Sequence, residues 1–165
     1  MVLSYLRYRA IKYRFLFVHQ LVAMGDKMDV DLTPLRLQFV LVANGRAFVS
    51  EGDTTVGVGQ VKLPPSSPLS ELRREIVNES KPLLDNIPPH RLIVYPTTRL
   101  NREGSKELLT KLRSMVANPN SATLTFNEPT YSRMDDLDLL QDIFEPAYID
   151  PRAIHLIVDC TDASK

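Results

Sequence analysis

Cysteine is nearly absent from this chain, which has a single thiol, Cys160, and no tryptophan. One cysteine cannot form an internal disulfide, and it has no second cysteine with which to build a metal clip or a redox motif. No apolar run approaches the roughly 18 residues of a membrane-spanning helix, so we expect no membrane span. The fold must depend on an apolar core, which 165 residues with 44% apolar side chains can form within one domain.

An excess of charge of either sign is also missing, because twenty basic side chains balance twenty acidic ones. A dedicated nucleic-acid binder usually carries a basic excess, so we expect no nucleic-acid partner. The charge is unevenly distributed, however. Residues 1–23 contain four basic residues and no acidic one, which leaves sixteen basic and twenty acidic residues in 24–165. This contrast indicates that residues 1–23 are a basic leader outside the fold.

The leader has three interpretations. Its basic residues followed by the apolar stretch 15–23 resemble a secretory signal peptide, although His19 and Gln20 interrupt that stretch. It is also compatible with an arginine-rich transit peptide, although it contains a single serine. Alternatively, it is a mis-annotated extension of a protein that begins at Met24. In each case, residues 24–34 are expected to be a linker.

The first half of the folded region predicts a β-hairpin. Residues 35–42 alternate between apolar and polar and then become continuously apolar, which suits a central strand. Asn44-Gly45 supplies a turn, because both residues tolerate a positive φ. A return strand is expected at 47–49, and strand structure resumes at 57–63.

A helix is predicted after Pro64-Pro65. Ser66 or Ser67 can cap its N-terminus, and Pro68 suits the first helical position. Its apolar stripe consists of Leu69, Leu72, Ile76 and Val77, with Arg73, Arg74 and Glu75 on the outer side. A short strand at 91–95 follows this helix.

The second half predicts an amphipathic helix at 103–117 and an edge strand at 122–126. A short acidic helix or turn is expected at 134–144, with four apolar side chains directed inward: Leu137, Leu140, Ile143 and Phe144. The β-branched segment 154–158 predicts a last strand in the middle of the sheet. The element order indicates an α+β fold. It is a ubiquitin-like β-grasp with a mixed sheet, one crossing helix and a helical insertion, placed at 96–150, before the last strand.

Candidate catalytic residues are sparse. The histidines His19, His90 and His155 lie far apart in sequence, and none adjoins a nucleophile motif. The glycine-enriched segment containing Gly52, Gly57 and Gly59 precedes a strand, whereas a phosphate-binding loop opens a helix with a Gly-Lys-Ser/Thr sequence. We therefore expect no enzymatic activity and no catalytic or cofactor-binding residues. A cleft that brings His90 or His155 close to Asp or Ser side chains would favour the enzyme hypothesis instead.

No metal site is expected either. The acidic cluster comprises Asp135, Asp136, Asp138, Asp142 and Glu145. Leucines occupy the positions where a calcium loop needs ligands or a bend, so the cluster is interpreted as a solvated acidic face. The neighbouring acids Asp159 and Asp162 are expected to raise the pKa of the Cys160 thiol.

Two stretches resemble the N-terminal header domain of Crinkler effectors, which oomycetes secrete and several fungi encode. The first is 35–95, with its apolar strands, glycine-bearing loop and leucine-rich helix. The second runs from Leu137-Asp138-Leu139-Leu140-Gln141-Asp142-Ile143-Phe144-Glu145-Pro146 into Ile154-His155-Leu156-Ile157-Val158. The oomycete translocation motif Leu-x-Leu-Phe-Leu-Ala-Lys is absent. The resemblance implies a fungal-type header domain at 35–160, followed by a tail at 161–165.

Two functional hypotheses follow. The resemblance implies a secreted, non-catalytic, monomeric domain that serves in delivery or recognition and meets a protein partner in a host cell. The alternative is a cytoplasmic or nuclear ubiquitin-like adaptor that binds proteins through an exposed sheet face. A conjugated modifier is disfavoured, because the sequence ends in Asp162-Ala163-Ser164-Lys165 and lacks the diglycine that isopeptide chemistry uses.

Overall fold

The computed structural model describes residues 33–50, 52–97, 100–118, 120–126, 132–145 and 148–161. These residues belong to one compact unit, Thr33–Lys165. The predicted leader at 1–23, most of the linker at 24–34 and residues 162–165 of the tail lie outside the described residues. Within the described part, no helix combines the length and the apolar character needed to cross a membrane.

The hairpin begins with β1 (Leu35–Ala43), as the sequence predicts. Asn44 and Gly45 have φ values of 51° and 69°, so both residues of the turn occupy the left-handed region. The return strand β2 (Arg46–Ala47) is shorter than expected. One further backbone bond joins Phe48 N–H to the Leu41 carbonyl, after which the chain leaves β1.

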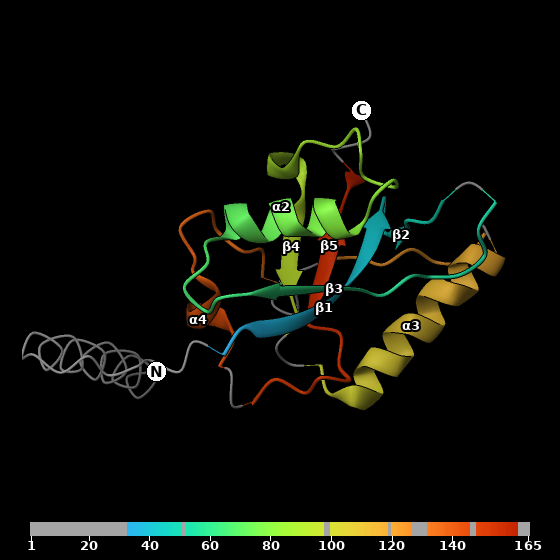
Figure 1. Cartoon of the computed structure of the whole chain (residues 1–165). Coiled ribbons are helices and arrows are strands. Elements are labelled where there is room, and N and C mark those ends of the chain that lie inside the picture. The colour runs from blue at the N-terminus through green and yellow to red at the C-terminus, as the bar shows by residue number, and fades with distance from the viewer. Residues whose placement is uncertain are drawn as a thin grey trace, which may run out of the picture. The chain divides into compact units, whose positions relative to one another are not determined.

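The five described strands form one mixed sheet (Figure 1). β3 (Gly59–Leu63) pairs antiparallel with the first half of β1, and β2 pairs with its end. On its other side, β1 pairs in parallel with β5 (Leu156–Asp159), and β5 pairs antiparallel with β4 (Ile93–Pro96). The last strand therefore lies in the middle of the sheet, which confirms its predicted position. The protein is a mixed α+β fold.

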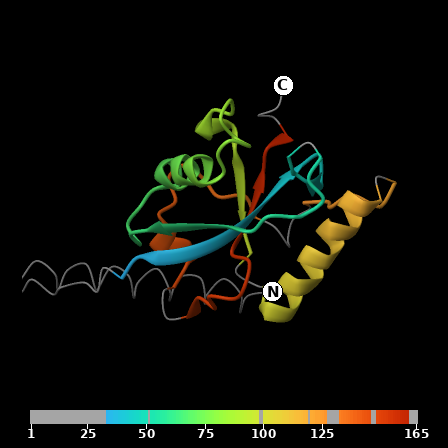
Figure 2. The same cartoon turned by 45° about the vertical axis from the view of Figure 1, so that its right-hand side comes forward.

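Helices cover both faces of the sheet (Figure 2). α2 (Leu69–Glu79) packs on the face formed by Leu35, Leu37, Phe39 and Leu41. α3 (Arg102–Ala117) packs on the opposite face, against Val40, Val42 and Ile157. This arrangement explains why β1 alternates at first and then becomes continuously apolar. Only its second half is covered on both faces, and Arg36 in the first half is exposed.

The start of α2 differs from the prediction. Pro68 occupies the N-cap and no side chain caps the helix, so the expected cap by Ser66 or Ser67 is wrong. Ser67 is buried, and its carbonyl accepts a hydrogen bond from the backbone N–H of Leu140. The chain just before α2 is thus joined to the inserted segment by backbone bonds to the Ser67 and Pro65 carbonyls, which the local sequence does not reveal.

The outer side of α2 contains a second correction. Arg73, predicted to be exposed, is only 5% exposed, and it forms an ion pair with Asp136. Arg73 is one of the buried residues of α2, and Asp136 of the inserted segment accepts a hydrogen bond from its guanidinium. A position at the border of the stripe becomes buried when a distant segment crosses the helix.

The insertion between β4 and β5 contains α3 and the single-turn α4 (Leu140–Ile143). α3 agrees with its predicted bounds to within one residue, and Asn101 caps it by accepting a hydrogen bond from Gly104 N–H. Of the short acidic helix or turn expected at 134–144, the helical part is the single turn α4. Leu140 and Phe144 are buried, but Leu137 is 90% exposed, so its predicted inward orientation is wrong.

The edge strand expected at 122–126 does not form. A backbone hydrogen bond, 2.7 Å from Leu124 N to the Gly45 carbonyl oxygen, holds this segment against the hairpin turn. The Phe126 ring stacks on Tyr95 of β4 with the ring centres 4.8 Å apart. Packing against β4 and α3 therefore places the segment, without a strand ladder.

Candidate functional site

His155 is the histidine closest to a catalytic arrangement. It lines a cleft of about 430 Å³ with Thr97, Asn101, Glu145, Tyr148 and Asp150 among the other residues. The structure thus brings His155 and Asp150 together, which is the condition stated for the enzyme hypothesis. His90 lies in the short 3-10 helix η1 (Pro89–Arg91) and does not line this cleft.

The His155 ring is fully engaged by backbone groups. Its Nδ1 accepts a hydrogen bond from Gln38 N–H at 2.8 Å, and its Nε2 lies 2.9 Å from the Asp150 carbonyl oxygen. These partners fix the neutral tautomer with the proton on Nε2. Burial lowers the pKa of His155, although the Asp150 backbone bond and charge oppose this shift. Both ring nitrogens are already bonded, so the imidazole extends the β1–β5 pairing and is poorly placed to act as a base.

Cys160 is equally unsuited to chemistry. Its side chain is buried directly after β5, and burial raises the pKa of the thiol to about 12. The charge of Asp159 contributes a smaller rise in the same direction. The sequence predicted the direction but assigned it to neighbouring acids, whereas burial is the larger cause. A thiol with this pKa forms very little thiolate at neutral pH.

The glycine-enriched segment does not build a phosphate-binding loop in its described residues. Gly59 is the first residue of β3, and a Cβ there would collide with the Phe39 ring. Gly52 has a φ of 83°, while Gly57 has open space around its Cα. Close packing against Phe39 therefore accounts for one glycine, and a turn accounts for another.

The acidic cluster is engaged mainly with the chain's own backbone. The carboxylate of Asp138 accepts a hydrogen bond from Asp135 N–H, and that of Asp142 accepts one from Leu139 N–H. Asp136 binds Arg73. Across the described ranges, no three His, Cys, Asp or Glu side chains are grouped to hold a metal ion. These acidic residues therefore hold the backbone of the inserted segment. The sequence alone indicated only that they form a solvated face.

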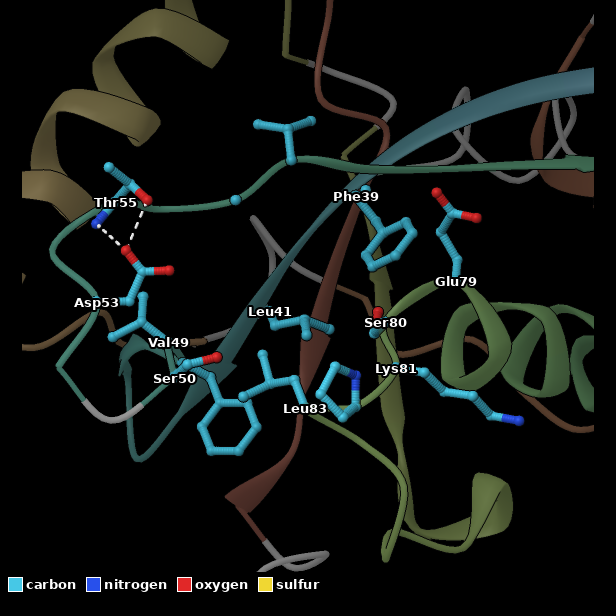
Figure 3. Close-up of a pocket in the computed structure, with 15 residues that line it drawn as sticks. Phe39, Leu41, Val49, Ser50, Asp53, Thr55, Glu79, Ser80, Lys81 and Leu83 are labelled. Atoms are coloured by element: carbon cyan, nitrogen blue, oxygen red, sulfur yellow. Dashed lines mark hydrogen bonds between the residues drawn. The ribbon is translucent and has the colours of Figure 1, made fainter.

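A second cleft, which the sequence did not reveal, lies between the hairpin and the end of α2 (Figure 3). It has a volume of about 320 Å³. Phe39, Leu41 and Leu83 lie toward its centre, and Lys81 points away from it. Asp53, on its rim, accepts hydrogen bonds from the hydroxyl and the N–H of Thr55, and these bonds lower the pKa of the Asp53 carboxyl. Its liners come from three separate segments, so no local motif marks it.

Comparisons of the chain with protein-family models, with curated proteins and with solved structures find no match.

Proposed function

We propose that this domain is a ubiquitin-like β-grasp and serves as a non-catalytic recognition module. The strand order supports the fold assignment, because β1 and β5 form a parallel central pair with an antiparallel neighbour on each side. α2 crosses one face of this sheet, as the β-grasp plan requires. The helical insertion before the last strand adds α3 on the opposite face.

The engagement of His155 carries the functional part of the proposal. This histidine has a cleft and a neighbouring acid, yet its two nitrogens bind backbone groups. Because this imidazole is not free to act as a base, we infer that the domain binds a partner and does not perform catalysis. By its resemblance to Crinkler header domains, we further propose that it is secreted and acts in recognition or delivery inside a host cell.

The second stretch that carries this resemblance begins in the inserted segment. The stretch from Leu137 to Phe144 contributes two buried side chains, Leu140 and Phe144, to the core on the α2 face. It leads into 154–158, of which residues 156–158 belong to the central strand β5. The residues that carry the resemblance therefore help to build the domain.

Fractionation of cultures that produce the native protein tests the secretion proposal. We expect the protein in the medium, or in the host cell when the culture grows with its host. Strict retention inside the producing cells under every condition would refute it. N-terminal sequencing of the native protein would then show whether the leader is removed or the chain begins at Met24.

The alternative, an intracellular adaptor, was expected to bind through an exposed sheet face. α3 covers that face over β5 and over the second half of β1, which leaves a polar area on β1 and β3. An adaptor of this kind would have to use that area or an edge of the sheet. A protein that carries no cleaved leader and remains inside the cell would favour this alternative.

A further inference from the structure

The register of the sheet identifies which backbone groups of β3 face outward. Gln38 of β1 directs both its N–H and its C=O toward His155 on the β5 side. The adjacent residues Leu37 and Phe39 must then direct theirs toward β3, where Val61 and Gly59 stand opposite. Consequently Gln60 and Lys62 of β3 point their backbone N–H and C=O groups away from the sheet.

Within the described ranges, these outward groups of Gln60 and Lys62 have no backbone hydrogen-bond partner. The opposite edge differs. On β4, the outward carbonyl of Val94 accepts a hydrogen bond from Met134 N–H at 2.9 Å. The inserted segment therefore closes one edge at this point, while β3 presents a row of donors and acceptors that can pair with another strand.

On the α2 side, the β3 edge leads into the cleft of Figure 3. Gly59 and the preceding residue Val58, which is 42% exposed, line that cleft. Its floor includes Phe39, Leu41 and Leu83. A strand added to β3 would direct every second side chain to this side of the sheet, where an apolar residue can be buried.

On the other side of the sheet, the same edge is basic. Arg36 and Lys62 are cross-strand partners and both are exposed. The register makes them a pair without mutual backbone bonds, the type in which side chains approach most closely. Like charges in this position repel each other, and neither residue forms an ion pair with a described acidic side chain. The alternate side chains of an added strand, on this face of the sheet, would lie near Arg36 and Lys62. Carboxylates at those positions would be attracted to the two basic side chains.

We propose that the outer edge of β3 binds an extended peptide in which apolar residues alternate with acidic ones. The peptide backbone pairs with Gln60 and Lys62. Its apolar side chains face the cleft on the α2 side, and its carboxylates face Arg36 and Lys62. This inference rests on the proposed recognition function and names the chemistry of the partner.

A synthetic peptide of roughly seven residues, with valine alternating with glutamate, matches the length of a typical strand and serves as the probe. One control peptide has the same composition with its valines and glutamates in two blocks, and a second has lysine in place of glutamate. Titration of each peptide into the full chain should show binding of the alternating acidic peptide, with both controls at least roughly tenfold weaker, which corresponds to about 1.4 kcal/mol. Equal binding of the three peptides, or no binding of the acidic one, would overturn the proposal.

Two matched substitutions test the backbone pairing. Gln60→Pro removes an outward N–H that the β1 ladder does not use, so the fold should be retained and peptide binding should fall by roughly tenfold. Gln60→Ala keeps this N–H and should bind the peptide as the native chain does. Thermal melting of both variants verifies that they are folded. Equal affinity of the two folded variants would exclude strand addition at this edge.

Charge reversal tests the basic side of the edge, where Arg36 and Lys62 lie. The double variant Arg36→Glu with Lys62→Glu should lose the acidic peptide and gain affinity for the lysine peptide. As a control, Lys111→Glu reverses one charge at an exposed position of α3 and should alter neither affinity. If Lys62 only protects the edge against self-association, no peptide will bind. Because these are measurements on purified protein, their failure is independent of the result of the secretion experiment.

Discussion

An Nη atom of Arg73 on α2 lies 2.6 Å from a carboxylate oxygen of Asp136 in the segment inserted between β4 and β5. The arginine side chain is 6% exposed and the aspartate side chain 74% exposed, so a buried cation depends on a partner at the surface. The Nε of Arg73 has no hydrogen-bond partner in the described part of the chain. The pair fastens the inserted segment to α2, at the cost of an incompletely satisfied guanidinium.

Asp136→Asn should therefore destabilise the domain, because it leaves the Arg73 cation buried with a weaker acceptor. We expect a loss of about 1–2 kcal/mol, less than for a fully buried pair because Asp136 is exposed. Arg73→Met, which keeps the aliphatic volume and removes the charge, should be nearly neutral or stabilising. Urea denaturation of the two variants measures both effects. A larger loss for Arg73→Met than for Asp136→Asn would contradict this account.

The central strand β5 allows a test of the two cores. Leu156 belongs to the core on the α2 side, and Ile157 to the core under α3. Truncating either to alanine should cost about 2–5 kcal/mol, a large part of a typical unfolding free energy. Leu137→Ala serves as the control, because this leucine is 90% exposed and should change stability by no more than about 0.5 kcal/mol. Tolerance of both β5 truncations would mean that β5 is peripheral to stability.

His155 should make stability depend on pH. Its pKa is lowered in the folded state, so the unfolded chain binds the proton more readily. The contribution of His155 to the unfolding free energy should be fully present above the unfolded pKa of about 6.5. It should be lost as the pH falls toward the lower folded pKa, by up to about 1.4 kcal/mol per pH unit. Chemical denaturation at a series of pH values measures this slope. The slope should decrease in His155→Gln. It should persist in the control His90→Gln, which removes an exposed imidazole. An unchanged slope in His155→Gln would argue against the role of the His155 ring.

Two glycines of the hairpin region should respond differently to alanine. Gly45 has a φ of 69°, and a Cβ there would collide with the Leu124 carbonyl oxygen. Gly45→Ala should lower the unfolding free energy by at least about 1 kcal/mol. Gly57 has open space and no left-handed φ, so Gly57→Ala should be close to neutral. Parallel thermal melts compare the pair, and equal melting temperatures would show that the turn is not constrained as described.

Sequence reasoning succeeded where a local pattern determines the structure. The alternation in β1, the Asn44-Gly45 turn and the stripe of α3 each depend on residues within a few positions of one another. The central position of β5 was predictable because its residues are apolar on both faces, as burial between two layers requires. These elements define most of the sheet and the two main helices.

The predictions failed where distant segments decide burial. Arg73 and Asp136 are 63 positions apart, so no window around α2 reveals that this arginine is covered. Leu137 was expected to face inward within a short helix or turn, but α4 begins only at Leu140 and Leu137 is exposed. The cleft beside the hairpin and the unpaired edge of β3 also arise from contacts between separate segments. The absence of catalysis, the secretion and the family resemblance remain predictions.

The bonds between Gln38 and His155 join residues that are 117 positions apart in the chain. Closing so long a loop requires a large loss of chain entropy before the parallel central pair can form, whereas the β1–β3 hairpin closes a much shorter one. Folding should therefore begin with the hairpin and α2, and the middle of the sheet should be completed late. Until β5 pairs with it, the apolar strand β1 has one unpaired edge. The chain is most vulnerable to aggregation in this interval.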